Sequence, residues 1–185
     1  MHELILGGQK SGKSRAAEAR AAAWLATAGR DALLIATALA GDAEMAARIA
    51  RHQLDRAARV PALRTLEEPR ALAEALRLHA APQRLLVIDC LTLWTTNLLM
   101  PMQGPRLDAA AWQATVDALL GALQAAAGPV VLVSNEIGLG LSPMSPEARH
   151  VVDALGALHQ RIAGACERVT LMVAGRALNL PRENP

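Results

Sequence analysis

The run from Gly7 to Ser14, Gly-Gly-Gln-Lys-Ser-Gly-Lys-Ser, limits the possible folds of this chain more than any other feature. It matches the pattern G-x-x-x-x-G-K-[ST], in which glycines let backbone N–H groups turn toward bound phosphates. Apolar residues 4–6 predict a strand before it, and residues 13–28 predict a helix that ends at Gly29. A strand, a glycine-rich loop and a helix N-terminus in this order form a phosphate-binding P-loop.

Short apolar runs alternate with longer amphipathic stretches along the rest of the chain. Strands are predicted at 32–37, 64–66, 85–89, 130–134 and 169–174, and helices at 44–56, 69–80, up to 99, 108–127 and 146–166; a short segment at 177–180 follows. Buried strands that alternate with helices are typical of a mostly parallel sheet with helices on both faces. The sequence therefore predicts an α/β protein with the P-loop NTPase fold. It shows no linker or repeat, so we expect residues 1–185 to form one domain.

Composition excludes several classes of protein. Apolar residues make up 52% of the chain and charged residues 19%, which excludes a disordered protein. A net charge of +2 and 2% aromatic residues offer neither a basic patch nor a stacking surface, so we do not expect nucleic acid as a partner. The uncharged run 118–135 is interrupted by Gly128-Pro129, and the first residues are too short and acidic for a signal peptide. We therefore expect no membrane span and a soluble, cytoplasmic protein.

The chain has two cysteines, Cys90 and Cys166, far apart in the sequence. Neither belongs to a C-x-x-C or other metal-binding spacing. Both lie among apolar residues, so we predict two buried thiols in a reducing compartment.

Chemistry-bearing residues lie at the ends of the predicted strands. Lys13 is expected to reach the β- and γ-phosphates of a nucleotide, and the Ser14 hydroxyl to bind Mg²⁺. Asp89 ends the predicted strand 85–89, where a P-loop enzyme places its second metal ligand; the alternative is that it caps the next helix. Glu136 follows the next buried strand and either positions a water or hydroxyl or has no role.

The predicted helix 44–56 carries a histidine among arginines. Residues spaced by four share one face: Glu44, Arg48, His52 and Arg56. Nearby cations suit a phosphate chain and favour a neutral imidazole, which is able to attack phosphorus. The alternative is a solvated face with ion pairs such as Glu44–Arg48 and Arg51–Asp55, and on the residues alone we prefer it. The other histidines show no comparable setting: His2, His79, His150 and His159.

Together these motifs resemble the bifunctional adenosylcobinamide kinase / adenosylcobinamide-phosphate guanylyltransferase family of cobalamin biosynthesis. The similarity extends from Leu4 to about Leu180. The matching segments are Gly7-Gly8-x-x-Ser11-Gly12-Lys13-Ser14, Arg48-Ile49-x-x-His52, Thr65-x-Glu67-Glu68-Pro69, Asp89-Cys90-Leu91-Thr92-Leu93-Trp94-x-x-Asn97 and Asn135-Glu136-Ile137-Gly138. The chain departs from the family pattern at Lys10, where Arg is usual, and at Leu63, where Trp is usual.

The resemblance implies two reactions. ATP or GTP first phosphorylates the hydroxyl of adenosylcobinamide, and GTP then donates GMP, carried on His52, to give adenosylcobinamide-GDP. His52 and Lys13 are then catalytic, Ser14 and Asp89 bind Mg²⁺, and the protein forms a homo-oligomer. The residues expected to bind nucleotide are Gly7, Gly8, Gln9, Lys10, Ser11, Gly12, Lys13, Ser14, Ala36, Thr37, Ala38, Gln53, Leu54, Asp55, Arg56, Glu67 and Asp89.

Two alternatives stay open at this point. One is a P-loop kinase that acts on another small molecule, in which His52 is structural. The other is a regulatory module that changes state with nucleotide, in which the loop 138–143 acts as a switch.

Overall fold

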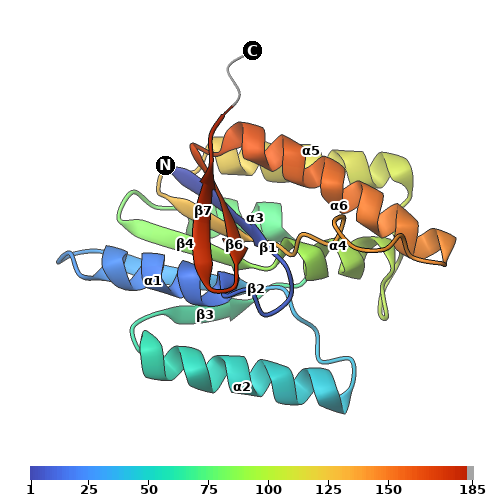
Figure 1. The fold of residues 1–185 in the computed structure, drawn as a ribbon. Coiled ribbons are helices and arrows are strands. Elements are labelled where there is room, and N and C mark those ends of the chain that lie inside the picture. Colours follow the sequence, from blue (N-terminus) through green and yellow to red (C-terminus); the bar gives the residue numbers. More distant parts are fainter. Residues whose placement is uncertain (183–185) are drawn as a thin grey trace.

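A computed structural model of the protein describes residues 1–182 (Figure 1). Seven strands form one sheet: β1 His2–Gly7, β2 Asp31–Ala36, β3 Arg64–Glu67, β4 Arg84–Asp89, β5 Val130–Val133, β6 Arg168–Val173 and β7 Arg176–Leu180. The helices are α1 Lys13–Leu25, α2 Ala43–Arg59, α3 Leu72–His79, α4 Leu91–Leu99, α5 Ala109–Gln124 and α6 Pro146–Ala165. Every strand and helix predicted from the sequence is present.

The strand order is β3-β2-β4-β5-β1-β6-β7. All neighbouring pairs are parallel except β6 and β7, which form an antiparallel hairpin at one edge. β1 lies between β5 and β6, with Leu4 opposite Leu132 and Val169. This mostly parallel sheet with helices on both faces confirms the predicted fold class, and it brings the carboxyl ends of β1, β4 and β5 to the same edge.

Some boundaries differ from the prediction for local reasons. α1 ends at Leu25 rather than residue 28, because the chain turns before Gly29. α3 starts at Leu72 rather than Pro69. The Glu68 carboxylate accepts the backbone N–H groups of Arg70 and Ala71, which holds the residues before α3 in a turn.

Two apolar layers cover the sheet. One contains buried residues of α3, α4, α5 and α6, and the other is built around α1. In the first layer, Trp94 and Trp112 pack with their ring centroids 5.4 Å apart. Both cysteines are buried and unbonded, as predicted. None of the helices in residues 1–182 has the length and apolar character that a membrane span requires.

Helix α2 lies on the α1 side of the sheet, at the bottom of Figure 1. Among residues 43–59, all of which the structure describes, only Arg56 is buried. The start of α2 is capped by Asp42, whose Oδ1 accepts the Met45 N–H at 2.7 Å. Its end is tied to α1 by Arg59, whose guanidinium makes two hydrogen bonds to Glu18, at 2.6 and 3.2 Å.

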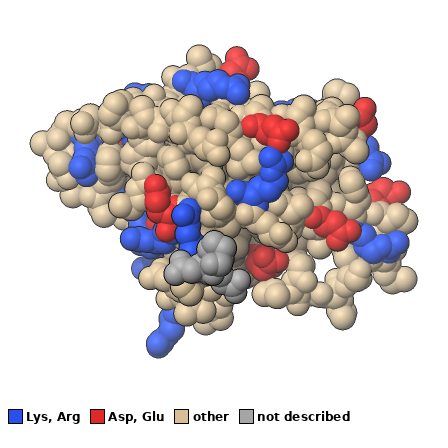
Figure 2. All heavy atoms as spheres, turned by 90° about the horizontal axis from the view of Figure 1, so that it is seen from above, with Lys and Arg blue, Asp and Glu red and all other residues tan. Residues whose placement is uncertain are grey.

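The surface mixes charges of both signs. On the face shown in Figure 2, acidic and basic side chains alternate between large areas without charge. The mixture of positive and negative side chains on this face is consistent with the small net charge of the sequence, +2.

Candidate active site

The P-loop, residues 7–14, links β1 to α1 and needs glycine at two positions. Gly7 has φ +151°, and a Cβ there would lie 2.4 Å from the carbonyl oxygen of Met172 in β6. Gly12 has φ +101° and forms the N-cap of α1 in the left-handed region. The tip of the β6–β7 hairpin also supports the loop, because the Gly175 N–H donates to the Ser11 carbonyl at 3.0 Å.

Lys13 lies inside this loop. It is 7% exposed, and its ammonium donates to the Gly8 carbonyl at 2.6 Å. Burial lowers the pKa of Lys13, and the nearby Cys90 and Asp89 side chains act in the opposite direction. A cation held here by a neutral carbonyl is placed to transfer its hydrogen bond to an incoming phosphate oxygen.

Asp89 and Ser14 meet at the carboxyl edge of the sheet. Burial raises the pKa of Asp89, while the nearby Ser14 hydroxyl, the His52 imidazole when it is protonated, and the Arg56 guanidinium oppose that rise. A hydroxyl and a carboxylate are oxygen ligands of the kind that Mg²⁺ prefers, with phosphate oxygens and water completing its shell. Within residues 1–182, three His, Cys, Asp or Glu side chains do not gather as a metal site. The donor set therefore fits a metal shared with a nucleotide rather than an all-protein metal site.

A cavity of about 810 Å³ lies between the P-loop and α2. The P-loop and the adjoining α1 line it from Gln9 to Arg15, and Asp89 contributes from β4. α2 contributes the predicted shared face, with His52 exposed to the cavity: Glu44, Arg48, His52 and Arg56. The structure thus brings together the phosphate-binding loop and the candidate nucleophile, which are far apart in the sequence.

The ion pairs expected for a purely solvated α2 do not form. Among residues 1–182, neither Glu44–Arg48 nor Arg51–Asp55 is an ion pair, and Asp55 instead lies 3.9 Å from Arg59. Glu44, Arg48 and Arg51 all line the large cavity. The arginines of α2 therefore give this cavity a positive wall suited to phosphates.

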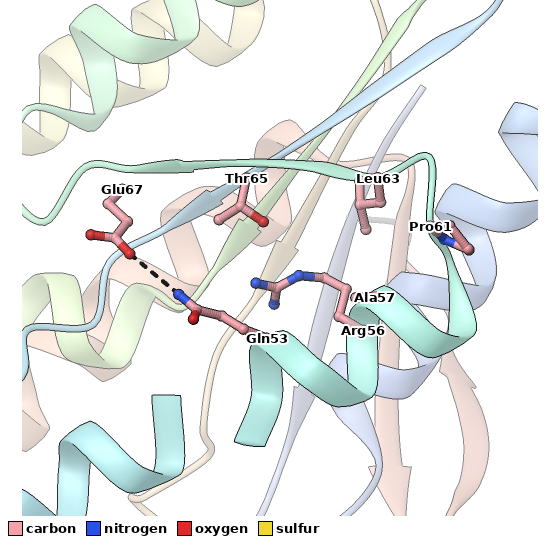
Figure 3. Close-up of a pocket in the computed structure, with 7 residues that line it drawn as sticks. All are labelled: Gln53, Arg56, Ala57, Pro61, Leu63, Thr65 and Glu67. Carbon is pink, nitrogen blue, oxygen red and sulfur yellow. Dashed lines mark hydrogen bonds between the residues drawn. The ribbon is translucent and has the colours of Figure 1, made fainter. Parts of the chain in front are cut away.

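A second cavity, of about 340 Å³, adjoins the large one between α2 and β3 (Figure 3). Its lining is Gln53, Arg56, Ala57, Pro61, Leu63, Thr65 and Glu67. Gln53 donates to Glu67 at 3.4 Å, the contact marked by the dashed line in Figure 3. Gln53, Arg56 and Glu67 line both cavities, so one ligand is able to extend from the P-loop into the small cavity.

The remaining predicted residues lie in different positions. Ala36, Ala38 and Asp55 line the large cavity. Thr37 is fully buried beneath it, where its hydroxyl donates to the Cys90 carbonyl and accepts the Cys90 N–H. Leu54 is 73% exposed and lines neither cavity. Gly7 and Gly8 shape the P-loop backbone but do not line the large cavity.

Several residues of the large cavity escaped the sequence-based site prediction: Arg15, Cys90, Leu93, Val133 and Asn135. Most of them could have been predicted from their place in the sequence. They lie at or shortly after the carboxyl ends of β4 and β5, where ligands bind in open α/β sheets. Burial raises the pKa of the Cys90 thiol to about 11, so the thiol stays protonated at neutral pH.

One histidine outside α2 has contacts that the sequence did not indicate. His159 of α6 is buried, and its Nε2 lies 2.7 Å from the Ser134 hydroxyl, directly after β5. Its Nδ1 lies 3.6 Å from Glu136 Oε2. Only tertiary structure brings these residues together, since α6 is separated from β5 by the loop 134–145.

The chain is similar to known proteins over almost its whole length. Residues 3–180 match the sequence model of the family described as "Cobinamide kinase / cobinamide phosphate guanyltransferase". The chain is 50% identical to the bifunctional adenosylcobalamin biosynthesis protein CobP of Pseudomonas aeruginosa, over 183 residues and 99% of each chain. It is 37% identical to the bifunctional adenosylcobalamin biosynthesis protein CobU of Escherichia coli, over 93% of this chain and 95% of the relative. These findings confirm the resemblance seen in the motifs.

The fold itself has a relative of quite different sequence. The flagellar accessory protein FlaH from Methanocaldococcus jannaschii aligns with a TM-score of 0.50 at 10% identity, covering 96% of this chain and 75% of FlaH. At 10% identity this similarity shows a shared fold and carries no information about function.

Proposed function

The chain belongs to the cobinamide kinase / cobinamide phosphate guanyltransferase family, and from that premise we propose that it is an enzyme that performs both reactions at one site. It phosphorylates the hydroxyl of adenosylcobinamide with ATP or GTP. It then transfers GMP from GTP to that phosphate through a GMP intermediate on His52. The observation that carries this proposal is the large cavity, which Lys13 of the P-loop region and His52 of α2 both line.

In the kinase step, the chain must hold a triphosphate and stabilise the charge that moves to the leaving group. The backbone N–H groups of the P-loop and the N-terminus of α1 bind phosphate oxygens, and Lys13 stabilises developing negative charge. Ser14 and Asp89 would hold Mg²⁺, which supplies further neutralisation of phosphate charge when bound. The acceptor hydroxyl attacks the γ-phosphorus, and the nucleoside diphosphate leaves.

In the guanylyl step, a neutral His52 attacks the α-phosphorus of GTP. A nitrogen–phosphorus bond forms, the bond from the α-phosphorus to the bridging oxygen breaks, and pyrophosphate leaves. A phosphate oxygen of adenosylcobinamide phosphate then attacks the same phosphorus and releases the imidazole. Arg48 and Arg56, one turn to either side of His52 on α2, neutralise the phosphate chain during both transfers.

The small cavity suits the guanine of GTP. Its Glu67 carboxylate is able to accept hydrogen bonds from N1–H and the N2 amino group, which guanine has and adenine lacks. Leu63 and Pro61 offer apolar contact to the ring. A base bound here places its phosphates along α2 and toward the P-loop, because Gln53 and Arg56 line both cavities.

The test uses GTP labelled at the α-phosphate with Mg²⁺. The denatured wild-type protein should retain label in an acid-labile, alkali-stable bond, as expected for a phosphoramidate. His52→Asn should retain none yet still phosphorylate adenosylcobinamide. His150→Asn, at an exposed position of α6, is the matched control and should label normally.

Two results would favour the alternatives. A His52→Asn variant that retains guanylyl transfer would make His52 structural and favour a simple P-loop kinase. Nucleotide hydrolysis without any transfer to a corrinoid, with an oligomeric state that changes with nucleotide, would favour a regulatory module. Assembly as a homo-oligomer and a cytoplasmic location stay predictions from the sequence.

A further inference from the structure

A network of polar side chains lies behind the end of β5, next to Asn135, which lines the large cavity. The Thr92 hydroxyl of α4 lies 3.1 Å from the Ser134 hydroxyl. Ser134 lies 2.7 Å from Nε2 of His159, whose Nδ1 faces Oε2 of Glu136 at 3.6 Å. Ser134 is fully buried and His159 is 6% exposed, so water does not replace these contacts.

These groups allow an arrangement of hydrogen bonds that points a proton at Glu136. The Asn135 backbone N–H donates to the Thr92 hydroxyl at 2.8 Å, and in the contact between the Thr92 and Ser134 hydroxyls either oxygen is able to donate. When Ser134 donates to His159 Nε2, the neutral imidazole carries its proton on Nδ1, toward Glu136. Burial lowers the pKa of His159 more than the Glu136 carboxylate raises it, so the imidazole is neutral at neutral pH.

The Nδ1 atom of His159 is buried and has no hydrogen-bond partner among residues 1–182, as is also the case for Nδ1 of His2. At His159 this atom faces the Glu136 carboxylate, 3.6 Å away. An unpaired buried N–H destabilises the fold. A carboxylate 3.6 Å away completes this bond with a small movement, which fits a group that shifts when substrate binds.

Glu136 follows the end of β5, next to the first residue of the P-loop. β5 runs between β1, which leads into the P-loop, and β4, which ends at Asp89. The Glu136 N–H donates to the Gly7 carbonyl at 3.0 Å, and the neighbouring Asn135 lines the large cavity. The Glu136 side chain is 24% exposed, with Oε1 held by the Gly138 N–H at 2.9 Å.

We propose that Glu136 accepts the proton of the acceptor hydroxyl in the kinase step and that His159 is the positioning residue that orients its carboxylate. As the hydroxyl oxygen bonds to the γ-phosphorus, its proton passes to Glu136. The bond from the γ-phosphorus to the bridging oxygen breaks, and its electron pair leaves with the nucleoside diphosphate. Glu136 then returns the proton to solvent. This inference rests on the proposed kinase activity.

The first test replaces Glu136 with Gln, which keeps the size of the side chain and removes its basicity. We expect kcat for phosphorylation of adenosylcobinamide to fall about 10²-fold, the lower range for loss of a general base. KM for the nucleotide should stay within about twofold, because the P-loop is unchanged. Labelling of His52 by GTP should also persist, which shows that the variant is folded.

The second test separates positioning from packing at His159. Asn places its amide near the former Nδ1 and restores a donor to Glu136, whereas Gln reaches the former Nε2 and restores only the contact with Ser134. We expect His159→Gln to lower the kinase kcat roughly tenfold, within the range for a misplaced catalytic group. His159→Asn should recover most of that loss, and His150→Asn on the same helix should change nothing.

The outcomes distinguish two kinds of failure. If the wild-type enzyme does not phosphorylate adenosylcobinamide, the proposed kinase activity is wrong and this inference is wrong with it. If the wild type does so and Glu136→Gln is equally fast, only the role of Glu136 is overturned. If Gln rather than Asn restores activity at His159, the histidine acts through Ser134 and does not position Glu136.

Discussion

The P-loop and helix α2 supply the two sides of the large cavity, and the protein holds them in very different ways. The P-loop is enclosed by β1, the β6–β7 hairpin and α1, with Lys13 buried inside it. α2 carries His52 on a helix in which Arg56 is the one buried residue among positions 43–59. A segment with few buried contacts opens locally at low cost, whereas a buried loop moves only with the core.

This difference suits the two reactions. Both need the same firm hold on phosphates, which the P-loop provides without rearrangement. In the proposed mechanism only guanylyl transfer uses the His52 imidazole at the α-phosphorus, and a weakly packed helix is able to bring it there and withdraw it. The comparison therefore predicts that changes at the P-loop affect both reactions, while changes in α2 affect them unequally.

The largest effect should follow Lys13→Ala. Both phosphorylation of adenosylcobinamide and labelling of the protein by GTP should fall by about 10³-fold, because each loses a preorganised cation at the phosphates. Initial rates of the two half-reactions, measured at saturating nucleotide, check this. Arg106→Ala, in the exposed loop before α5, is the control for loss of a positive charge. A loss confined to one reaction would show that the two do not share the P-loop.

A pair of leucines compares the packing of α2 with that of the central sheet, which carries the P-loop. Leu86→Ala in β4 removes a side chain that is 1% exposed and should lower the free energy of unfolding by about 2–5 kcal/mol. Leu54→Ala in α2 removes one that is 73% exposed and should change it by less than about 0.5 kcal/mol. Urea unfolding of both variants gives the comparison. Equal losses would mean that α2 is packed against a surface in solution.

The third effect concerns the contact that joins the two regions. Arg59→Ala removes both hydrogen bonds to Glu18, a carboxylate that is 2% exposed, and leaves it unpaired. We expect a loss of about 1–3 kcal/mol in stability. Labelling of His52 should slow more than phosphorylation of adenosylcobinamide, because α2 loses its attachment to α1.

Arg59→Lys is the matched variant, because it keeps the charge and loses the two-pronged geometry. It should fall between wild type and Arg59→Ala in both stability and the ratio of the two rates. A parallel fall of both reactions in Arg59→Ala would instead indicate that α2 and the P-loop move as one unit.

The same contrast explains what the sequence could predict. The P-loop and the buried strands are specified locally, by glycine spacing and by runs of Val, Ile and Leu, so fold class and the positions of Lys13, Ser14 and Asp89 followed directly. His52 was suggested by its helix face but needed the family resemblance to outweigh a solvated helix. Its place opposite the P-loop depends on tertiary structure.

His159 shows what local patterns leave out. It lies on an amphipathic helix, at a position where the apolar pattern predicts burial. The residues next to it in the sequence do not indicate which side chains it contacts. Its contacts with Ser134 and Glu136 arise because α6 packs over the end of β5. The hydrogen bonds between the Thr37 hydroxyl and the backbone of Cys90 also depend on tertiary structure.

The smallest effect should come from the opposite, amino edge of the sheet. There Asp31 pairs with Arg84 at 2.7 Å and Arg64 at 3.0 Å, which ties the starts of β2, β4 and β3 together. The hydrogen bonds from Arg84 lower the pKa of Asp31 in the folded protein. The pairing therefore stabilises the fold above the unfolded-state pKa of about 3.9 and is lost as the pH falls through the lower folded value.

Because the Asp31 side chain is 42% exposed, we expect Asp31→Asn to cost at most about 1 kcal/mol at pH 7. The difference in Tm between the variant and the wild type should shrink as the pH is lowered from 6 toward 3, since protonation removes the same charge from the wild type. Both enzymatic rates should stay unchanged at pH 7, because Asp31 lies at the edge of the sheet opposite the P-loop. A loss of guanylyl transfer in this variant would show that the amino edge of the sheet also controls α2, and the contrast between a rigid phosphate site and a separately held helix would then be wrong.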